Sequence, residues 1–175
     1  MVGHATVEKE SEKREVDYQK IQSDDFTKLS KVVGGRYLLS TVGLNQLSSV
    51  YEFAQIRIQC SKPYHRRTLD IMTTTNSKGR WARDWLLGRR SAEPQPPSCG
   101  SYERLAQDTS YLGNHCNMWL DETWWNNMVY FDPMEAYVGG VSYVGVNLYG
   151  GDDFCDDNSN HPHFNNVGQW SFYVR

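Results

Sequence analysis

An acidic segment near the C-terminal end holds the densest group of residues that could bind a metal ion. The stretch GGDDFCDDNSNHPHFNN, residues 150–166, places four aspartates around one cysteine and adds two histidines. Calcium takes six to eight oxygen ligands, whereas zinc prefers histidine and cysteine. Three interpretations are therefore open: a calcium loop, a zinc site or a solvated turn.

The residue order favours calcium over zinc if an ion binds at all. The candidate calcium ligands are Asp152, Asp153, Asp156, Asp157 and Asn158. The EF-hand order of ligands is absent, and the spacing of His161 and His163 around a proline is weak evidence for zinc. We expect Cys155 to form a disulfide, which removes the thiolate and leaves mostly hard oxygen ligands. A solvated loop remains the alternative.

A tryptophan-rich segment, residues 116–131, has the composition of a sugar-binding site. Aromatic rings can stack on the face of a sugar, while neighbouring carboxylates and amides bond its hydroxyl groups. The candidate ligand-binding residues are Trp119, Trp124, Trp125, Asp121, Asn126 and Asn127. The alternative is that these tryptophans belong to the core, because hydrophobic residues make up only 39% of the chain.

Four widely spaced cysteines fit two disulfides in an oxidising compartment, with buried free thiols as the alternative. Four cysteines allow three connectivities, and the sequence alone cannot choose among them. We favour Cys99–Cys116, which would close a compact loop around a predicted helix, together with Cys60–Cys155 between neighbouring strands. Each would stabilise the fold by about 2–4 kcal/mol.

Other function classes receive little support from the sequence. The chain lacks the nucleophile elbow, the zinc-protease helix and the nucleotide-binding glycine patterns, so an enzyme is disfavoured. Residues 60–104 carry nine Lys or Arg against four acids, whereas residues 105–175 carry one Arg against nine acids. We expect these two regions to pair with each other and predict no nucleic-acid partner. No apolar run is long enough to insert into a membrane.

The elements that would position these residues are mostly short strands between glycine and proline turns. The clearest is residues 49–60, where Ala54, Ile56, Ile58 and Cys60 alternate with polar residues. We predict further strands in residues 35–44, 128–132, 136–150 and 169–175, a hairpin over 68–87, and one short helix from Tyr102 to Leu112. This pattern predicts an all-β fold, an antiparallel sandwich or barrel with two disulfides.

The charged residues 1–23 read as an N-terminal extension, helical or disordered, ahead of a single domain over residues 24–175. The first residues lack the apolar core of a signal peptide, so we expect either a cytosolic protein or the mature form of a secreted one.

Several segments together resemble a cysteine-bearing domain of secreted invertebrate proteins, chiefly molluscan. They are IRIQCSKPYHRRTLDI, PPSCGSYERLAQDTSYLGNHCNMW, FCDDN and the terminal WSFYVR. The resemblance spans about residues 50–175. It implies secretion and both disulfide pairs, and some members of this group are egg-fluid or mucus proteins. It implies no catalytic residues.

The sequence thus predicts an extracellular, non-enzymatic binding domain, lectin-like, that binds a glycan through its aromatic side chains with calcium assistance if an ion binds. A carrier of an apolar ligand, pigment or lipid, or an egg-storage protein, is the second hypothesis. A small oxygenase or luciferase-type enzyme with an aromatic pocket is the third. An oligomer is compatible with all three.

Overall fold

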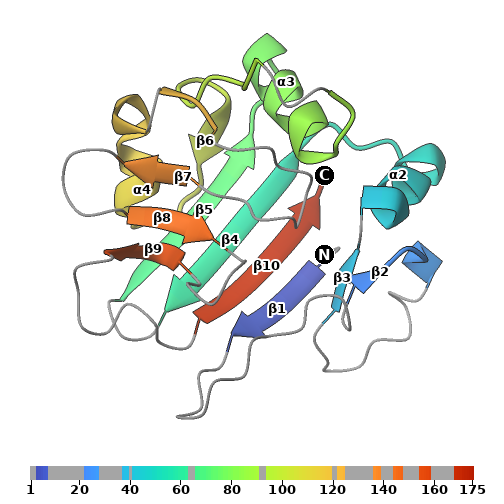
Figure 1. Ribbon diagram of the computed structural model, residues 1–175, viewed down its shortest axis with the longest axis horizontal. Coiled ribbons are helices and arrows are strands. Elements are labelled where there is room, and N and C mark those ends of the chain that lie inside the picture. The colour runs from blue at the N-terminus through green and yellow to red at the C-terminus, as the bar shows by residue number, and fades with distance from the viewer. Residues whose placement is uncertain are drawn as a thin grey trace.

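The structure is a computed structural model that describes residues 3–7, 22–27, 37–39, 41–62, 66–90, 94–119, 122–124, 136–138, 144–147, 154–158 and 168–175. Within these ranges the chain forms strands β1 to β10 and helices α2, α3 and α4 (Figure 1).

Seven strands form one sheet in the order β2-β3-β1-β10-β4-β5-β6. Their bounds are β1 Gly3–Val7, β2 Gln22–Ser23, β3 Tyr37–Leu39, β4 Ile56–Lys62, β5 Arg67–Thr73, β6 Tyr102–Arg104 and β10 Gly168–Val174. Neighbouring strands are antiparallel except β2 and β3. The fold is therefore mostly β, as predicted, but this sheet is open, and no barrel closes within the described ranges.

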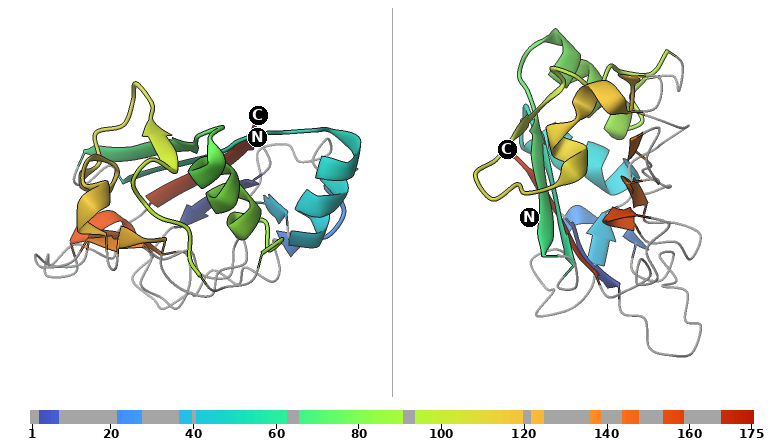
Figure 2. Two further views of the ribbon diagram at one scale, coloured as in Figure 1. Left: turned by 90° about the horizontal axis from the view of Figure 1, so that it is seen from above. Right: turned by 90° about the vertical axis from the view of Figure 1, so that its left-hand side faces the viewer.

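A second sheet and the helices lie together on one side of the large sheet (Figure 2). The second sheet has the order β7-β8-β9. The bounds are β7 Ala136–Val138, β8 Val144–Asn147, β9 Phe154–Asn158, α2 Thr41–Val50, α3 Ser77–Leu86 and α4 Tyr111–Asn114, followed by a 3-10 turn at Cys116–Met118. Of the helices in the described ranges, none is long and apolar enough to cross a bilayer.

The core fills the space between the large sheet and this layer. Ile58, Ile71 and Phe172 lie side by side on β4, β5 and β10 and are each 1% exposed. The predicted alternation in β4 is confirmed from Ile56 to Cys60, whose inward side chains are fully buried. Ala54 lies outside the strand and is exposed.

The predicted hairpin over residues 68–87 is wrong in its second half, which is helix α3. Asn76 caps this helix because its side chain accepts a hydrogen bond of 2.9 Å from the Gly79 amide. Ala82, Trp85 and Leu86 are buried at the three- and four-residue spacing of a helix. The second strand was predicted because Trp81, Arg83 and Trp85 lie at every second position, but of these three only Trp85 is buried.

The predicted helix from Tyr102 to Leu112 is also mostly wrong. Residues 102–104 form β6, which pairs with the edge of β5, and only residues 111–114 are helical. The predicted strand over 35–44 is a short strand followed by α2, whose buried residues include Leu44 and Leu47. In both segments the edge pairing and core packing override local propensity.

The N-terminal residues contribute to the large sheet. Strand β1 pairs with β10 and β3, and β2 pairs with β3. The chain before residue 24 therefore supplies two strands to the domain, rather than only an extension. Residues 8–21 lie outside the described ranges.

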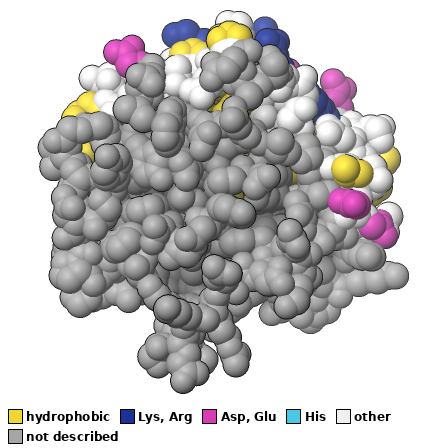
Figure 3. All heavy atoms as spheres, in the orientation of Figure 1, with side chains coloured by type: hydrophobic (Ala, Val, Ile, Leu, Met, Phe, Trp, Pro, Cys, Tyr) yellow, Lys and Arg dark blue, Asp and Glu magenta, His cyan; other side chains and the backbone are white. Residues whose placement is uncertain are grey.

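The described side chains that are visible in Figure 3 lie mainly over α3 and α2. Basic side chains gather over α3 at the top of the view. Near the two ends of α2, Val42, Val50 and Tyr51 are large hydrophobic residues that are more than half exposed.

A substitution at Gly79 tests the close contact between α3 and the residue that follows β5. A Cβ atom at this position would lie 2.0 Å from the carbonyl oxygen of Thr74. Replacing glycine with alanine inside a helix normally stabilises the helix by about 1 kcal/mol. At Gly79 the close contact should make the same substitution destabilising. We expect Gly79→Ala to lower the free energy of unfolding by about 1–3 kcal/mol, measured by thermal denaturation. Ser77→Ala on the exposed start of the same helix is the control, and a stabilised Gly79→Ala would contradict the contact.

Candidate functional site

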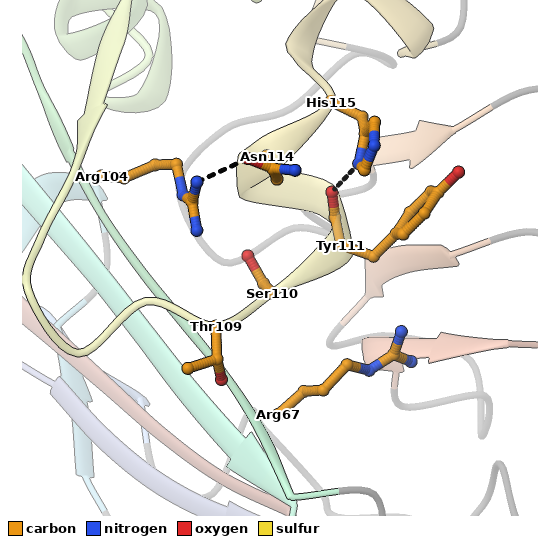
Figure 4. A pocket seen from close by; sticks show the side chains of 7 residues that line it. All are labelled: Arg67, Arg104, Thr109, Ser110, Tyr111, Asn114 and His115. Atoms are coloured by element: carbon orange, nitrogen blue, oxygen red, sulfur yellow. Dashed lines mark hydrogen bonds between the residues drawn. The ribbon is translucent and has the colours of Figure 1, made fainter.

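A polar cleft of about 280 Å³ opens beside α4 (Figure 4). The side chains that line it are Arg67, Arg104, Thr109, Ser110, Tyr111, Asn114 and His115. They come from β5, from the end of β6 and from the segment through α4. None of these residues was a predicted site residue, although the basic stretch that contains the two arginines was noted in the sequence.

Helix α4 has only four residues, too few to be stable alone. A buried carboxylate holds its first turn. Asp156, fully buried, accepts hydrogen bonds of 2.9 Å from the Tyr111 amide and 2.8 Å from the Leu112 amide. The same carboxylate lies 3.1 Å from Nε of Arg67, and the Arg67 guanidinium also donates to the Asp156 carbonyl oxygen.

A β-bulge directs Asp156 toward α4. In the β8–β9 ladder, Gly145 pairs with Asp157 and Val146 pairs with Cys155, so Asp156 is the extra residue. Its φ of 59° is in the left-handed region, which aspartate tolerates better than most residues. The bulge breaks the alternation of the strand at this position, so the side chain's direction does not follow from its place in the sequence.

A second buried aspartate fixes the other wall of the cleft. Oδ1 of Asp108 accepts hydrogen bonds from the Asp70 amide at 2.9 Å and from the Ser110 hydroxyl at 2.7 Å. Its Oδ2 lies 2.5 Å from Nε of Arg104. The Ser110 hydroxyl also accepts from the Gly113 amide. The loop from β6 to α4 is therefore held by one carboxylate.

A third ion pair lies nearby on the sheet, where the half-buried Arg57 binds the buried Asp70 through two hydrogen bonds of 2.7 Å. Hydrogen bonding to Asp70 raises the pKa of Arg57 above its ordinary value. The guanidinium also lies over the ring of Tyr173, 4.9 Å from its centroid. The expected pairing of the basic middle with the acidic end is confirmed by Arg67–Asp156 and Arg104–Asp108.

Two of the predicted sugar-binding tryptophans are in the core. Trp119 and Trp124 are 2% and 1% exposed. Trp119 stacks on Tyr102 with ring centroids 5.2 Å apart, and Trp124 meets Trp119 edge-on at 5.0 Å. Because both side chains are buried among other rings, their ring faces are out of reach of a sugar. Trp125, Asp121, Asn126 and Asn127 lie outside the described residues.

This aromatic cluster supports the last turn of α4. Nε1 of Trp119 donates to the Leu112 carbonyl at 3.0 Å, and the Tyr102 hydroxyl donates to the Gly113 carbonyl at 3.1 Å. The Leu112 carbonyl also accepts from the His115 amide at 3.2 Å, and carbonyls at the end of a helix lack partners within the helix itself. The two tryptophans that the sequence placed in the ligand site are therefore part of the core under the cleft. Trp119 binds the backbone of α4, and Trp124 packs against Trp119.

The aromatic surface of the cleft is the stacked pair Tyr111 and His115. Their ring centroids are 4.0 Å apart with an angle of 27° between the planes, and both residues are half-buried. Nδ1 of His115 is 2.8 Å from the Tyr111 carbonyl oxygen, so Nδ1 carries the proton that it donates. A tyrosine with a hydrophobic neighbour and a histidine four residues later was the signal available in the sequence.

The cleft does not have the geometry of a nucleophilic site. The Ser110 hydroxyl is bonded to Asp108 and the Gly113 amide, and the recorded hydrogen bond of His115 is to a carbonyl oxygen rather than to Ser110. Ser110 is also only 2% exposed, and both of these hydrogen bonds hold the loop and the start of α4, so little of its hydroxyl is presented to a substrate. The arrangement of these described residues suits binding through hydrogen bonds and stacking.

The acidic loop is described only in part. Both carboxylate oxygens of Asp156 accept hydrogen bonds from backbone amides of the protein. This carboxylate therefore points toward α4 and does not face a calcium site. No cluster of three or more metal-binding side chains occurs among the described residues. The side chains of Asp152, Asp153, Asp157 and Asn158 lie outside them, as do those of His161 and His163, so the calcium hypothesis for those residues stays a prediction.

The predicted disulfide Cys99–Cys116 is confirmed, with its Cα atoms 5.0 Å apart. It ties the segment before β6 to the residue after His115, and Ser98 adds a 2.7 Å hydrogen bond to the Cys116 carbonyl. The disulfide therefore anchors the C-terminal side of the cleft. The pair Cys60–Cys155 stays a prediction, because the Cys155 side chain is not described.

The comparisons with family models, with curated proteins and with solved structures found no match to the chain.

Removing the Asp156 carboxylate should destabilise the fold strongly. Asp156→Ala leaves two amides and the Arg67 guanidinium without their acceptor, which costs about 3–5 kcal/mol. Chemical denaturation measures the loss, and Glu103→Ala removes an exposed carboxylate as the control. In a double-mutant cycle with Arg67→Ala, the two effects should fall short of additivity; additive effects would contradict the ion pair.

Tyr102 should make the protein sensitive to alkali. Burial, assisted by the charge of Asp108, raises the pKa of its hydroxyl well above the ordinary value of 10.0. The unfolded chain then loses this proton at lower pH than the folded one, so stability is complete below about pH 10 and falls as the pH rises further.

Tyr102→Phe should flatten this decline while costing about 1 kcal/mol at neutral pH for the lost hydrogen bond. Denaturation midpoints between about pH 8 and 12 measure the slope. Tyr51→Phe, on an exposed side chain, should leave the slope unchanged. An equal slope in Tyr102→Phe and the wild type would show that Tyr102 is not responsible.

Proposed function

We propose that the protein is a non-enzymatic, lectin-like binding domain whose glycan site is the cleft beside α4. The observation that carries this proposal is the combination in one cleft of a stacked aromatic pair with fixed polar side chains. Sugar recognition needs an aromatic surface for the apolar face of the ring and hydrogen-bonding groups for its hydroxyls. Tyr111 and His115 supply the first, and Arg104, Thr109 and Asn114 supply the second.

The polar groups are held before any ligand arrives, which supports a binding role. Arg104 is fixed by Asp108 and donates to Oδ1 of Asn114 at 2.6 Å. Thr109 Oγ1 accepts from the Thr68 amide at 2.9 Å. Fixed side chains lose little conformational entropy on binding, so more of the contact energy contributes to affinity.

The alternative, a carrier of an apolar ligand, is less well supported. It requires a cavity lined by aromatic or aliphatic side chains, whereas the described rings of Tyr102, Trp119 and Trp124 pack against one another. The cleft beside α4 is lined by polar and charged side chains. An apolar ligand would leave these groups without hydrogen-bond partners.

Secretion is part of the proposal. A disulfide such as Cys99–Cys116 is typical of oxidising compartments. The second pair, Cys60–Cys155, is supported by the burial of Cys60 on β4 and by the contact between β4 and β9, the strand that contains Cys155. The resemblance to secreted invertebrate domains supports this location.

A glycan array probed with the folded protein tests the proposal. We expect binding that Tyr111→Ala reduces about tenfold, since one stacked ring contributes about 1–2 kcal/mol. Tyr51→Ala is the matched control, because Tyr51 is 62% exposed at the end of α2, far from α4 in Figure 1. A parallel array with a chelator tests calcium assistance. Absence of binding by the folded wild type in both arrays would overturn the glycan proposal.

A further inference from the structure

The polar side chains of the cleft present hydrogen-bond donors rather than an even mixture of donors and acceptors. The lining contains two arginines and no acidic residue. Because arginine has no acceptor atom, the Asn114 atom that faces Arg104 is its oxygen, and the amide nitrogen is left as a donor. Thr109 accepts from the Thr68 amide, so its hydroxyl hydrogen is also available for donation.

Arg104 is the strongest of these donors. Its guanidinium has five N–H groups, and its described partners are Asp108, through Nε and Nη2, and Asn114, through Nη1. Two N–H groups therefore remain beyond these three contacts. The side chain is 39% exposed, whereas that of Asp108 is 0% exposed. A ligand in the cleft can reach the guanidinium without meeting the carboxylate.

The second arginine shows the same asymmetry of charge. The Arg67 side chain is 29% exposed over an Asp156 carboxylate that is 0% exposed. The buried carboxylate oxygens already accept bonds from the Tyr111 and Leu112 amides. Both pairs are neutral as a whole, but in each the positive partner faces the cleft and the negative partner lies beneath it.

We propose that the ligand of this cleft is an acidic glycan, whose carboxylate or sulfate group binds Arg104, Asn114 and Thr109 beside the Tyr111–His115 stack. This inference rests on the proposed function and adds the chemical class of the sugar. An anionic group offers only acceptors, which matches the surplus of donors, and its hydrogen bonds to a guanidinium are charge-assisted. A neutral sugar hydroxyl offers both a donor and an acceptor, so its donor would have fewer partners among the donor-rich side chains of the cleft.

The test compares a neutral oligosaccharide with the same oligosaccharide carrying a sulfate ester or a uronic acid, by calorimetry on the full chain. We expect the acidic form to bind about tenfold more tightly at low salt, and this advantage to fall as salt is added. Inorganic sulfate should compete with the acidic form more strongly than with the neutral one.

Two variants connect this preference to the cleft. Arg104→Gln should weaken binding of the acidic form much more than binding of the neutral form and so remove most of the acidic advantage, and Arg80→Gln, on the exposed face of α3, should change neither affinity. Since Arg104→Gln leaves Asp108 buried without its partner, its melting temperature is checked first. If it does not fold, Arg104→Lys serves instead, because it keeps the charge and loses the planar fork.

The outcomes separate the two levels of the proposal. Equal affinity for the neutral and acidic forms, with no competition by sulfate, would overturn the acidic preference and leave glycan binding standing. No affinity for either form in the folded protein would overturn both. An acidic preference that survives unchanged in folded Arg104→Gln would show that the anionic group binds elsewhere.

Discussion

The structure around the cleft depends on one desolvated carboxylate, that of Asp156. It joins three elements that are distant in the chain: the bulged strand β9, the start of α4 and Arg67 on β5. A charge removed from water is costly unless it is paired and fully hydrogen-bonded. The residue is therefore stable in its place only when all three elements are assembled, so the carboxylate makes the formation of α4 conditional on the packing of the two sheets.

The same principle explains how so short a helix persists. The first amides of α4 are bound by Asp156, the Gly113 amide by Ser110, and the Leu112 and Gly113 carbonyls by Trp119 and Tyr102. The first amides and last carbonyls of any α-helix lack partners within the helix, and in a helix of four residues they are nearly all of its backbone groups, so side chains from other parts of the chain satisfy them here. The cleft is thus built on a rigid base although its own secondary structure is minimal, and the Cys99–Cys116 disulfide closes the far end of that base.

The sequence predicted those parts of the fold that follow a local period. Strand β4 was found because Ile56, Ile58 and Cys60 alternate regularly, and the loop disulfide because its two cysteines bracket a short segment. Helix α3 was missed because Trp81, Arg83 and Trp85 also alternate, while the buried set of Gly79, Ala82 and Trp85 has helical spacing.

The site itself could not be found in this way. Its arginines and aspartates are 4 to 89 residues apart in the chain, and their pairing is decided by strand order. The tryptophans were conspicuous in composition, yet burial assigns two of them to the support of the cleft rather than to its surface.

The bulge at Asp156 makes the length of β9 as important as its composition. At the bulge, β9 has one residue more than the part of β8 with which it pairs, and a regular ladder would lack this extra residue. Loss of the extra residue would restore a regular ladder and remove the position from which the Asp156 carboxylate reaches α4. Related sequences should therefore vary in side chains at this strand while keeping its residue count, so that insertions and deletions collect in the connections on either side.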